Sequence, residues 1–299
     1  MTKRTSQGLG VFQVFLAALL WGTAGTFAKH LFNSHISPFD LAQARITLSF
    51  AVLLLTLALV DKKLLRIRLK DLPYFMIYGI LGLAFNQFAY LFTISLTNVA
   101  TAIFLQYLGP ALMLVYGLAV KVEKPSPLKF LAVGASVLGG YLIVLGTSTG
   151  LGLSTLGLIS GLLSAVLFAF YSIFGKYGLA KYNSWTLLTW GFGFGSLAWS
   201  FYQLPWMPLI NNPQSIGQFL YIAVFASVIP FGLYLKGLQR LSAFKAGLIA
   251  TLEPVTAAFS AFIFLNEVLN GMQILGCAFI LIGIVLVQVK NIPKKKHKR

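Results

Sequence analysis

The chain has 299 residues, of which 58% are hydrophobic and 10% are charged. Soluble domains carry roughly 25% charged residues, so this composition excludes an ordinary water-soluble protein and indicates a chain that folds in lipid. A net charge of +17 would favour nucleic-acid binding in a soluble protein, but no segment here is polar enough to form a module that could hold nucleic acid. We therefore expect membrane lipid, and not nucleic acid, around the basic residues.

Apolar segments follow one another along almost the whole chain, each close to the about 20 residues that a membrane-spanning helix needs. Cutting them at charges, prolines and polar turns predicts helices at 10–30, 39–60, 72–96, 99–121, 128–146, 153–177, 184–204, 216–239, 244–265 and 272–289. A transmembrane β-barrel would instead show short alternating segments. The fold class predicted is thus an all-α polytopic membrane protein with ten transmembrane helices.

The basic residues indicate how these helices are oriented. With the N-terminus in the cytoplasm, all Lys and Arg residues except Lys29 and Arg45 fall on the cytoplasmic side. Because cationic residues gather in cytoplasmic loops, this orientation is favoured, and both termini are expected in the cytoplasm of a multi-pass protein of the inner (plasma) membrane. The basic tail, 291–299, is expected to contact anionic lipid.

The two halves of the chain repeat each other. Pro110 and Pro254 are 144 positions apart, and so are Tyr90 and Tyr234. Glu123 and Glu267, and Gly139 and Gly283, have the same spacing. We therefore predict one five-helix repeat at 1–147 and a second at 148–290. Five is odd, so the second copy enters the membrane from the opposite face, and such inverted repeats are typical of secondary transporters with alternating access.

Several residues carry a family resemblance, in the order Trp21-Gly22, Arg45, Gly109-Pro110, Glu123, Glu253-Pro254 and Glu267. This pattern resembles the EamA-type transporters of the drug/metabolite transporter superfamily, although the Trp-Gly pair and the membrane Arg have no counterpart in the second half. The resemblance implies helices arranged around a central cavity, with the fifth and tenth helices peripheral. It also implies an amino acid, a metabolite or a drug as cargo, often exported, and no nucleotide cofactor, and the sequence has no phosphate-binding Gly-rich Lys-Ser/Thr motif.

Glu253 is the one acid that falls deep within a predicted helix. An ionisable side chain at this depth is costly and favours a functional site. Three interpretations remain open: a proton or cation coupling site, a counter-charge for a substrate amine, and a hydrogen-bonded structural acid beside Pro254.

Arg45 lies about two turns inside its helix. Its long side chain can snorkel outward, which we favour, or reach a carboxylate in the cavity. Pro110 and Pro254 each remove a backbone hydrogen bond at matching places, and so predict kinks that either gate the cavity or shape the bundle.

Polar and aromatic residues at a similar depth predict a substrate pocket, because such groups avoid lipid. The candidate binding residues are Trp21, Thr26, Asn86, Gln87, Tyr90, Gln106, Tyr107, Tyr171, Trp190, Tyr234 and Glu253, with Ser172 beside them. Gly157 and Gly161 have a GxxxG spacing that predicts close helix packing, with a homodimer as a second use.

The favoured function is a secondary transporter for a small metabolite. A lipid-modifying membrane enzyme would need paired acids, a metal cluster or a nucleophile with a base at membrane depth, and the deep acid is alone. A channel would show a ring of repeated charges or a filter segment. The one cysteine, Cys277, predicts no metal site or disulfide.

Overall fold

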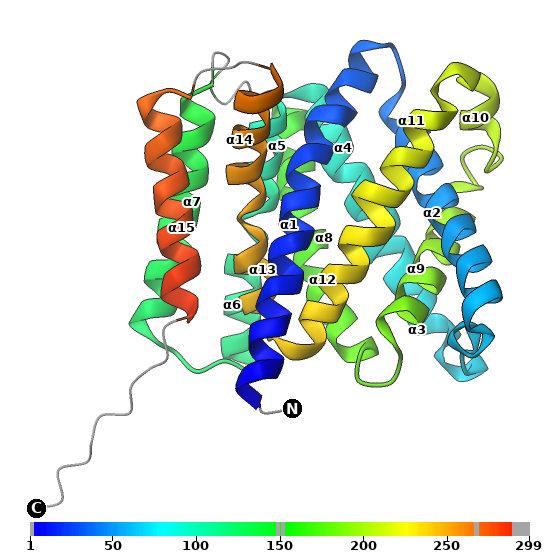
Figure 1. The fold of residues 1–299 in the computed structure, drawn as a ribbon, viewed down its shortest axis with the longest axis horizontal. Helices are drawn as coiled ribbons and strands as arrows, with labels where there is room; N and C mark the ends of the chain where they lie inside the picture. Colours follow the sequence, from blue (N-terminus) through cyan, green and yellow to red (C-terminus); the bar gives the residue numbers. More distant parts are fainter. Residues whose placement is uncertain (1–2, 148–149, 151–152, 266–268, 289–299) are drawn as a thin grey trace, which may run out of the picture.

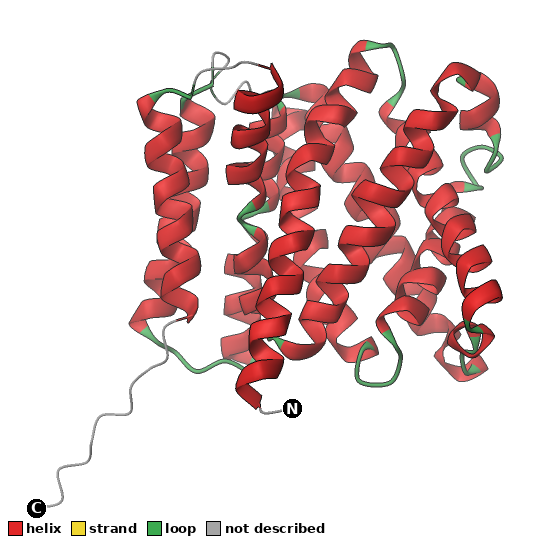
Figure 2. Ribbon diagram, in the orientation of Figure 1, coloured by secondary structure: helices red, strands yellow, loops and turns green. Residues whose placement is uncertain are grey.

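The computed structural model describes the backbone of residues 3–147, 150, 153–265 and 269–288, and their side chains except those of 3–5, 26 and 261–265. Every regular element in this part of the chain is helical (Figure 2). In the first half these are α1 (Lys3–Asn33), α2 (Pro38–Val60), η1 (Lys62–Leu65), η2 (Leu69–Asp71), α3 (Leu72–Ile77), η3 (Tyr78–Phe85), α4 (Asn86–Leu96), α5 (Val99–Gln106), α6 (Gly109–Ala119) and α7 (Pro127–Leu145).

The second half follows the same order of long helices. Its elements are α8 (Thr155–Gly178), α9 (Ser184–Trp199), α10 (Met207–Asn211), η4 (Pro213–Ser215), α11 (Ile216–Tyr221), η5 (Ile222–Val228), α12 (Ile229–Arg240), α13 (Ala243–Ala250), α14 (Glu253–Leu265) and α15 (Gly271–Gln288). Short polar side chains cap the N-terminal ends of several of these helices by accepting a hydrogen bond from a first-turn N–H group. Asn98, Ser154, Asn183 and Ser242 do so for α5, α8, α9 and α13.

Eight helical runs among the described residues are long and apolar enough to cross a membrane. The protein is thus a multi-pass membrane protein. The predicted segments 184–204 and 244–265 correspond to the shorter helix α9 and to the broken pair α13 and α14. The first of these predictions is too long, because α9 ends at Trp199, where Ser200 donates back to the carbonyl of Ser196.

Two kinds of interruption occur at equivalent places in the two halves. The π-helical segments η3 and η5 begin at Tyr78 and Ile222, which are 144 positions apart. The helix predicted at 99–121 is broken between α5 and α6, directly before Pro110, and the helix predicted at 244–265 is broken directly before Pro254. Proline has no N–H group, so neither residue can donate to the carbonyl four positions earlier.

Close helix crossings hold the bundle together. Helices α7 and α15 lie side by side at one edge, where a Cβ atom on Gly139 would come 2.5 Å from the carbonyl oxygen of Gly276 (Figure 1). A Cβ atom on Gly22 would clash with the side chain of Thr256, so α1 and α14 require glycine there. Gly157 and Gly161 approach Thr97 and Leu105 of the same chain, which gives their GxxxG spacing a packing role; the homodimer stays a prediction.

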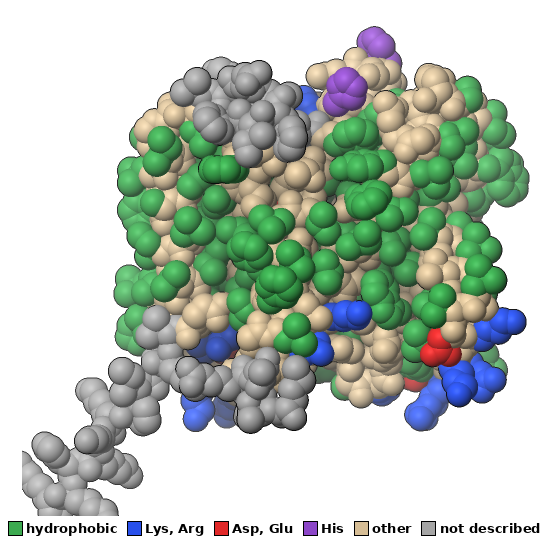
Figure 3. All heavy atoms as spheres, viewed as in Figure 1, with side chains coloured by type: hydrophobic (Ala, Val, Ile, Leu, Met, Phe, Trp, Pro, Cys, Tyr) green, Lys and Arg blue, Asp and Glu red, His purple; other side chains and the backbone are tan. Residues whose placement is uncertain are grey.

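Most charged residues among the described side chains lie at the ends of the bundle (Figure 3). In the view of Figure 3 most Lys and Arg side chains gather at the end where the N-terminus lies, and the histidine side chains lie at the other end. The band between them is largely apolar. Two partly buried lysine side chains have equivalent roles: Lys29 donates to the carbonyls of Ile94 and Thr97 at the end of α4, and Lys176 donates to those of Leu238 and Leu241 at the end of α12.

Candidate functional site

A small cavity lies in the middle of the bundle, where helices of both halves meet. Its volume is about 30 Å³, and its lining comes from α1, α2, α4, α5, α8, α12 and α14: Trp21, Ala24, Arg45, Asn86, Gln87, Tyr90, Gln106, Tyr107, Phe168, Phe231 and Glu253. A cavity of this size has room for water-sized groups and not for a metabolite. Passage of a solute would therefore require the surrounding helices to separate.

Glu253 is positioned by the break between α13 and α14. It is the first residue of α14 and is 4% exposed. The hydroxyl of Tyr107 donates to Oε2 at 2.7 Å, and that of Tyr90 donates to Oε1 at 3.3 Å. The N-terminal end of a helix also favours a negative charge. The carboxyl group of the second half is thus held by two phenols from the first half.

Arg45 does not snorkel outward, and the favoured prediction for this residue is wrong. Its guanidinium group is buried, with Nε donating to Ser227 Oγ at 2.6 Å and Nη2 donating to the carbonyl oxygen of Ala226 at 2.5 Å. That carbonyl is available because Pro230, four positions later, has no N–H group. The guanidinium also lies 6.0 Å from the ring centroid of Phe231.

Three amide side chains form another part of the lining. Gln106 Nε2 donates to Asn86 Oδ1 at 3.4 Å. Gln87 is 4% exposed, and its Nε2 has no hydrogen-bond partner among the described residues. The sequence predicted that these amides share one cavity, and the structure brings all three together there.

An aromatic cluster packs against the cavity. Trp21 lies 4.9 Å from Phe231 and 5.5 Å from Tyr234 between ring centroids. Tyr234 and Tyr171 are fully buried, and Tyr234 shares a 2.7 Å hydrogen bond with Ser172. These two tyrosines therefore support the lining residues and do not line the cavity themselves.

One other predicted pocket residue, Trp190, lies away from the cavity. The indole Nε1 of Trp190 donates to the carbonyl oxygen of Leu65 at 3.0 Å, so this side chain fastens α9 to η1 away from the cavity. The side chain of Thr26 lies outside the described residues. The lining residues Ala24, Phe168 and Phe231 were not predicted, because an apolar residue in an apolar helix gives no signal of its orientation.

The chain was compared with known proteins. The model of the EamA-like transporter family matches residues 8–145 and again residues 155–289. The chain belongs to this family. It is 28% identical to the uncharacterized inner membrane transporter YicL of Salmonella typhimurium over 287 residues, which cover 94% of this chain and 96% of that protein.

The chain is also similar to a second transporter and to a solved structure. An uncharacterized transporter of Archaeoglobus fulgidus is 27% identical over 214 residues, covering 69% of this chain and 75% of that protein. One crystal structure of a protein superposes with a TM-score of 0.73 and 18% identity, covering 96% of this chain and 97% of that one. At this identity the likeness concerns the fold alone. The names of the relatives fit a general transporter role for this EamA-like protein.

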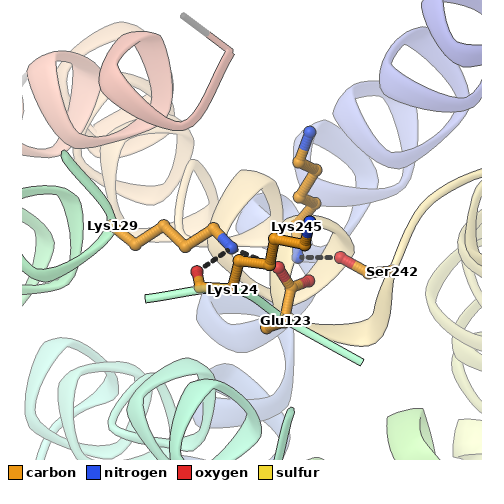
Figure 4. A network of polar contacts seen from close by, with 5 residues as sticks. All are labelled: Glu123, Lys124, Lys129, Ser242 and Lys245. Atoms are coloured by element: carbon orange, nitrogen blue, oxygen red, sulfur yellow. Dashed lines mark hydrogen bonds and ion pairs between the residues drawn. The ribbon is translucent and has the colours of Figure 1, made fainter. Parts of the chain in front are cut away.

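A second polar cluster of the EamA-like chain lies away from the cavity, between the end of α6 and the first turns of α7 and α13. Lys129 Nζ forms a 2.5 Å ion pair with Glu123 Oε2 and donates to the carbonyl oxygen of Lys124 (Figure 4). Ser242 caps α13 by accepting from the backbone N–H of Lys245 (Figure 4). Glu123 thus ties a loop to α7, whereas its repeat partner Glu267 lies outside the described residues.

Proposed function

We propose that this protein is a secondary transporter that exports a small amphipathic metabolite, such as an amino acid, an amine or a drug-like compound, by alternating access. The observation that carries the proposal is the cavity, where polar and aromatic side chains of both halves meet beside two broken helices. Substrate sites of secondary transporters lie near the midplane between repeats and are formed by discontinuous helices.

The proposed architecture is ten transmembrane helices in two inverted five-helix repeats, with both termini in the cytoplasm. This proposed number adds two membrane crossings, α9 and the pair α13 and α14, to the eight helical runs described above. Two observations support it: η3 and η5 have equivalent positions, and Lys29 and Lys176 each cap the end of an equivalent helix, α4 and α12. The proposed repeats are 1–147 and 148–290, followed by the basic tail 291–299.

Glu253 is proposed as the residue through which charge enters the transport cycle. A charge buried in the membrane interior is costly unless it is compensated. Its two phenol partners are neutral donors, so a proton, a cation, a substrate amine or Arg45 would compensate the carboxylate at one stage of the cycle. In this proposal the lining residues Trp21, Asn86, Gln87, Gln106 and Tyr107 contact the substrate.

The test is counterflow in liposomes that contain the purified protein, with a panel of amino acids, amines and aromatic compounds. We expect exchange of at least one class, and we expect Glu253→Gln to remove its dependence on pH or cations while the protein stays folded. Glu123→Gln is the matched control, because it makes the same change outside the cavity and should leave the pH profile unchanged. Absence of any exchange, with lipid being translocated or modified instead, would contradict the transporter proposal.

A further inference from the structure

The cavity contains hydrogen-bond donors that the protein does not satisfy. Arg45 uses Nε and Nη2 to hold Ser227 and Ala226, and no bond from its Nη1 to a described residue is formed. Gln87 Nε2 is buried without a partner. Both side chains line the same cavity, on the neighbouring helices α2 and α4.

Glu253, the acid in the cavity, forms no hydrogen bond or ion pair with these donors. Both carboxylate oxygens of Glu253 already accept from the phenols of Tyr107 and Tyr90. Of the ion pairs between described residues, none joins Glu253 to Arg45. A buried cation that forms no ion pair with a described residue, in the same cavity as an unsatisfied amide, is costly in a membrane interior. Such an arrangement is stable where a ligand supplies the missing acceptor.

We propose that Arg45 and Gln87 form an anion subsite that binds a carboxylate group of the transported compound. A guanidinium group matches the two oxygens of a carboxylate in geometry. One cation with one amide donor balances a single negative charge, which favours a monocarboxylate over a phosphate ester that carries nearly two charges. The rings of Trp21, Phe168 and Phe231 would contact the apolar body of the same molecule.

This inference rests on the proposed function, since it assigns one end of the substrate. Its test is equilibrium binding to the purified full chain in nanodiscs at pH 7, with 3-phenylpropanoate, 3-phenylpropanamide and 2-phenylethylamine as probes. The three compounds share an aromatic body and differ in the polar group. We expect the acid to bind at least about tenfold more tightly than the amide, as a charged acceptor requires.

Two variants of Gln87 then test the subsite itself. Gln87→Met removes the amide donor and should lower the preference for the acid several-fold. Gln87→Glu places a carboxylate beside Arg45, which gives this residue a counter-ion within the protein and should abolish the preference. Gln273→Glu, on α15 and outside the cavity, is the matched control and should bind as the native protein does.

Two results would overturn the subsite: no preference of the native protein for the acid over the amide, or an unchanged preference in both Gln87 variants. Counterflow separates this failure from failure of the proposed function. If amines or neutral compounds exchange while the acid neither binds nor exchanges, the protein is a transporter and the anion subsite is wrong.

Discussion

The two phenols that hold Glu253 should contribute unequally to stability. Tyr107 donates to Oε2 over 2.7 Å, which is the usual length for a strong O–H···O bond, whereas Tyr90 donates to Oε1 over 3.3 Å. Tyr107→Phe and Tyr90→Phe each delete one hydroxyl and keep the ring. Combined with Glu253→Leu, which removes both acceptor oxygens, they form two double-mutant cycles on one carboxyl group.

The distances set the expected magnitudes. Hydrogen bonds between side chains inside membrane proteins average about 0.6 kcal/mol and reach about 1.7 kcal/mol. The short bond of Tyr107 to a buried acid belongs near the upper end, so we expect a coupling energy of about 1 to 1.5 kcal/mol with Glu253. The long bond of Tyr90 belongs near the lower end, and we expect its coupling energy to stay below about 0.5 kcal/mol.

The assay is the free energy of unfolding in mixed micelles, followed by circular dichroism as a denaturing detergent is added. Coupling energies are the departure from additivity in each cycle. Tyr116→Phe is the control, because Tyr116 shares its hydrogen bond with Tyr177 at the exposed surface and should not couple to Glu253. A coupling energy at Tyr90 equal to or larger than that at Tyr107 would refute the assignment of the two bonds.

Two further outcomes are expected from the fold. In a variant that lacks Cys277, a cysteine at Ser34 should react with an impermeant reagent added to intact cells and a cysteine at Lys63 should not; the reverse pattern would contradict the proposed orientation. Gly139→Val places atoms against the backbone of α15, so it should lower the unfolding free energy by about 1 to 3 kcal/mol. Gly134→Val, on the same helix but without neighbours within 4 Å, should have little effect, and equal losses at both positions would refute the close crossing.

The sequence predicts most of the helices well. The predicted segment 72–96 coincides with α3, η3 and α4, and 39–60 differs from α2 by one residue. In lipid a backbone must satisfy its hydrogen bonds within each segment, so an apolar run determines a helix almost independently of its neighbours. The π-helical segments within these runs have no comparable local signal and were not predicted.

The residues of the cavity are predicted less completely. Polar residues such as Gln87, Gln106 and Glu253 were found from the sequence, because lipid excludes polar groups and the bundle interior accepts them. Trp190 was assigned to the cavity because of its depth and residue type, yet its indole N–H bonds to Leu65. Depth along a helix follows from the sequence, whereas the direction of a side chain around the helix depends on the packing partners.

Arg45 shows most directly what the sequence determines and what the tertiary structure decides. The sequence determined that a cation lies inside the second membrane segment, and it could not determine where the guanidinium group points. The tertiary structure decided this by bringing η5 against α2, so that the carbonyl of Ala226, which Pro230 cannot satisfy, accepts from Arg45. The bonding partner is 181 positions away in the chain, and only the packing of separate helices brings such distant groups together.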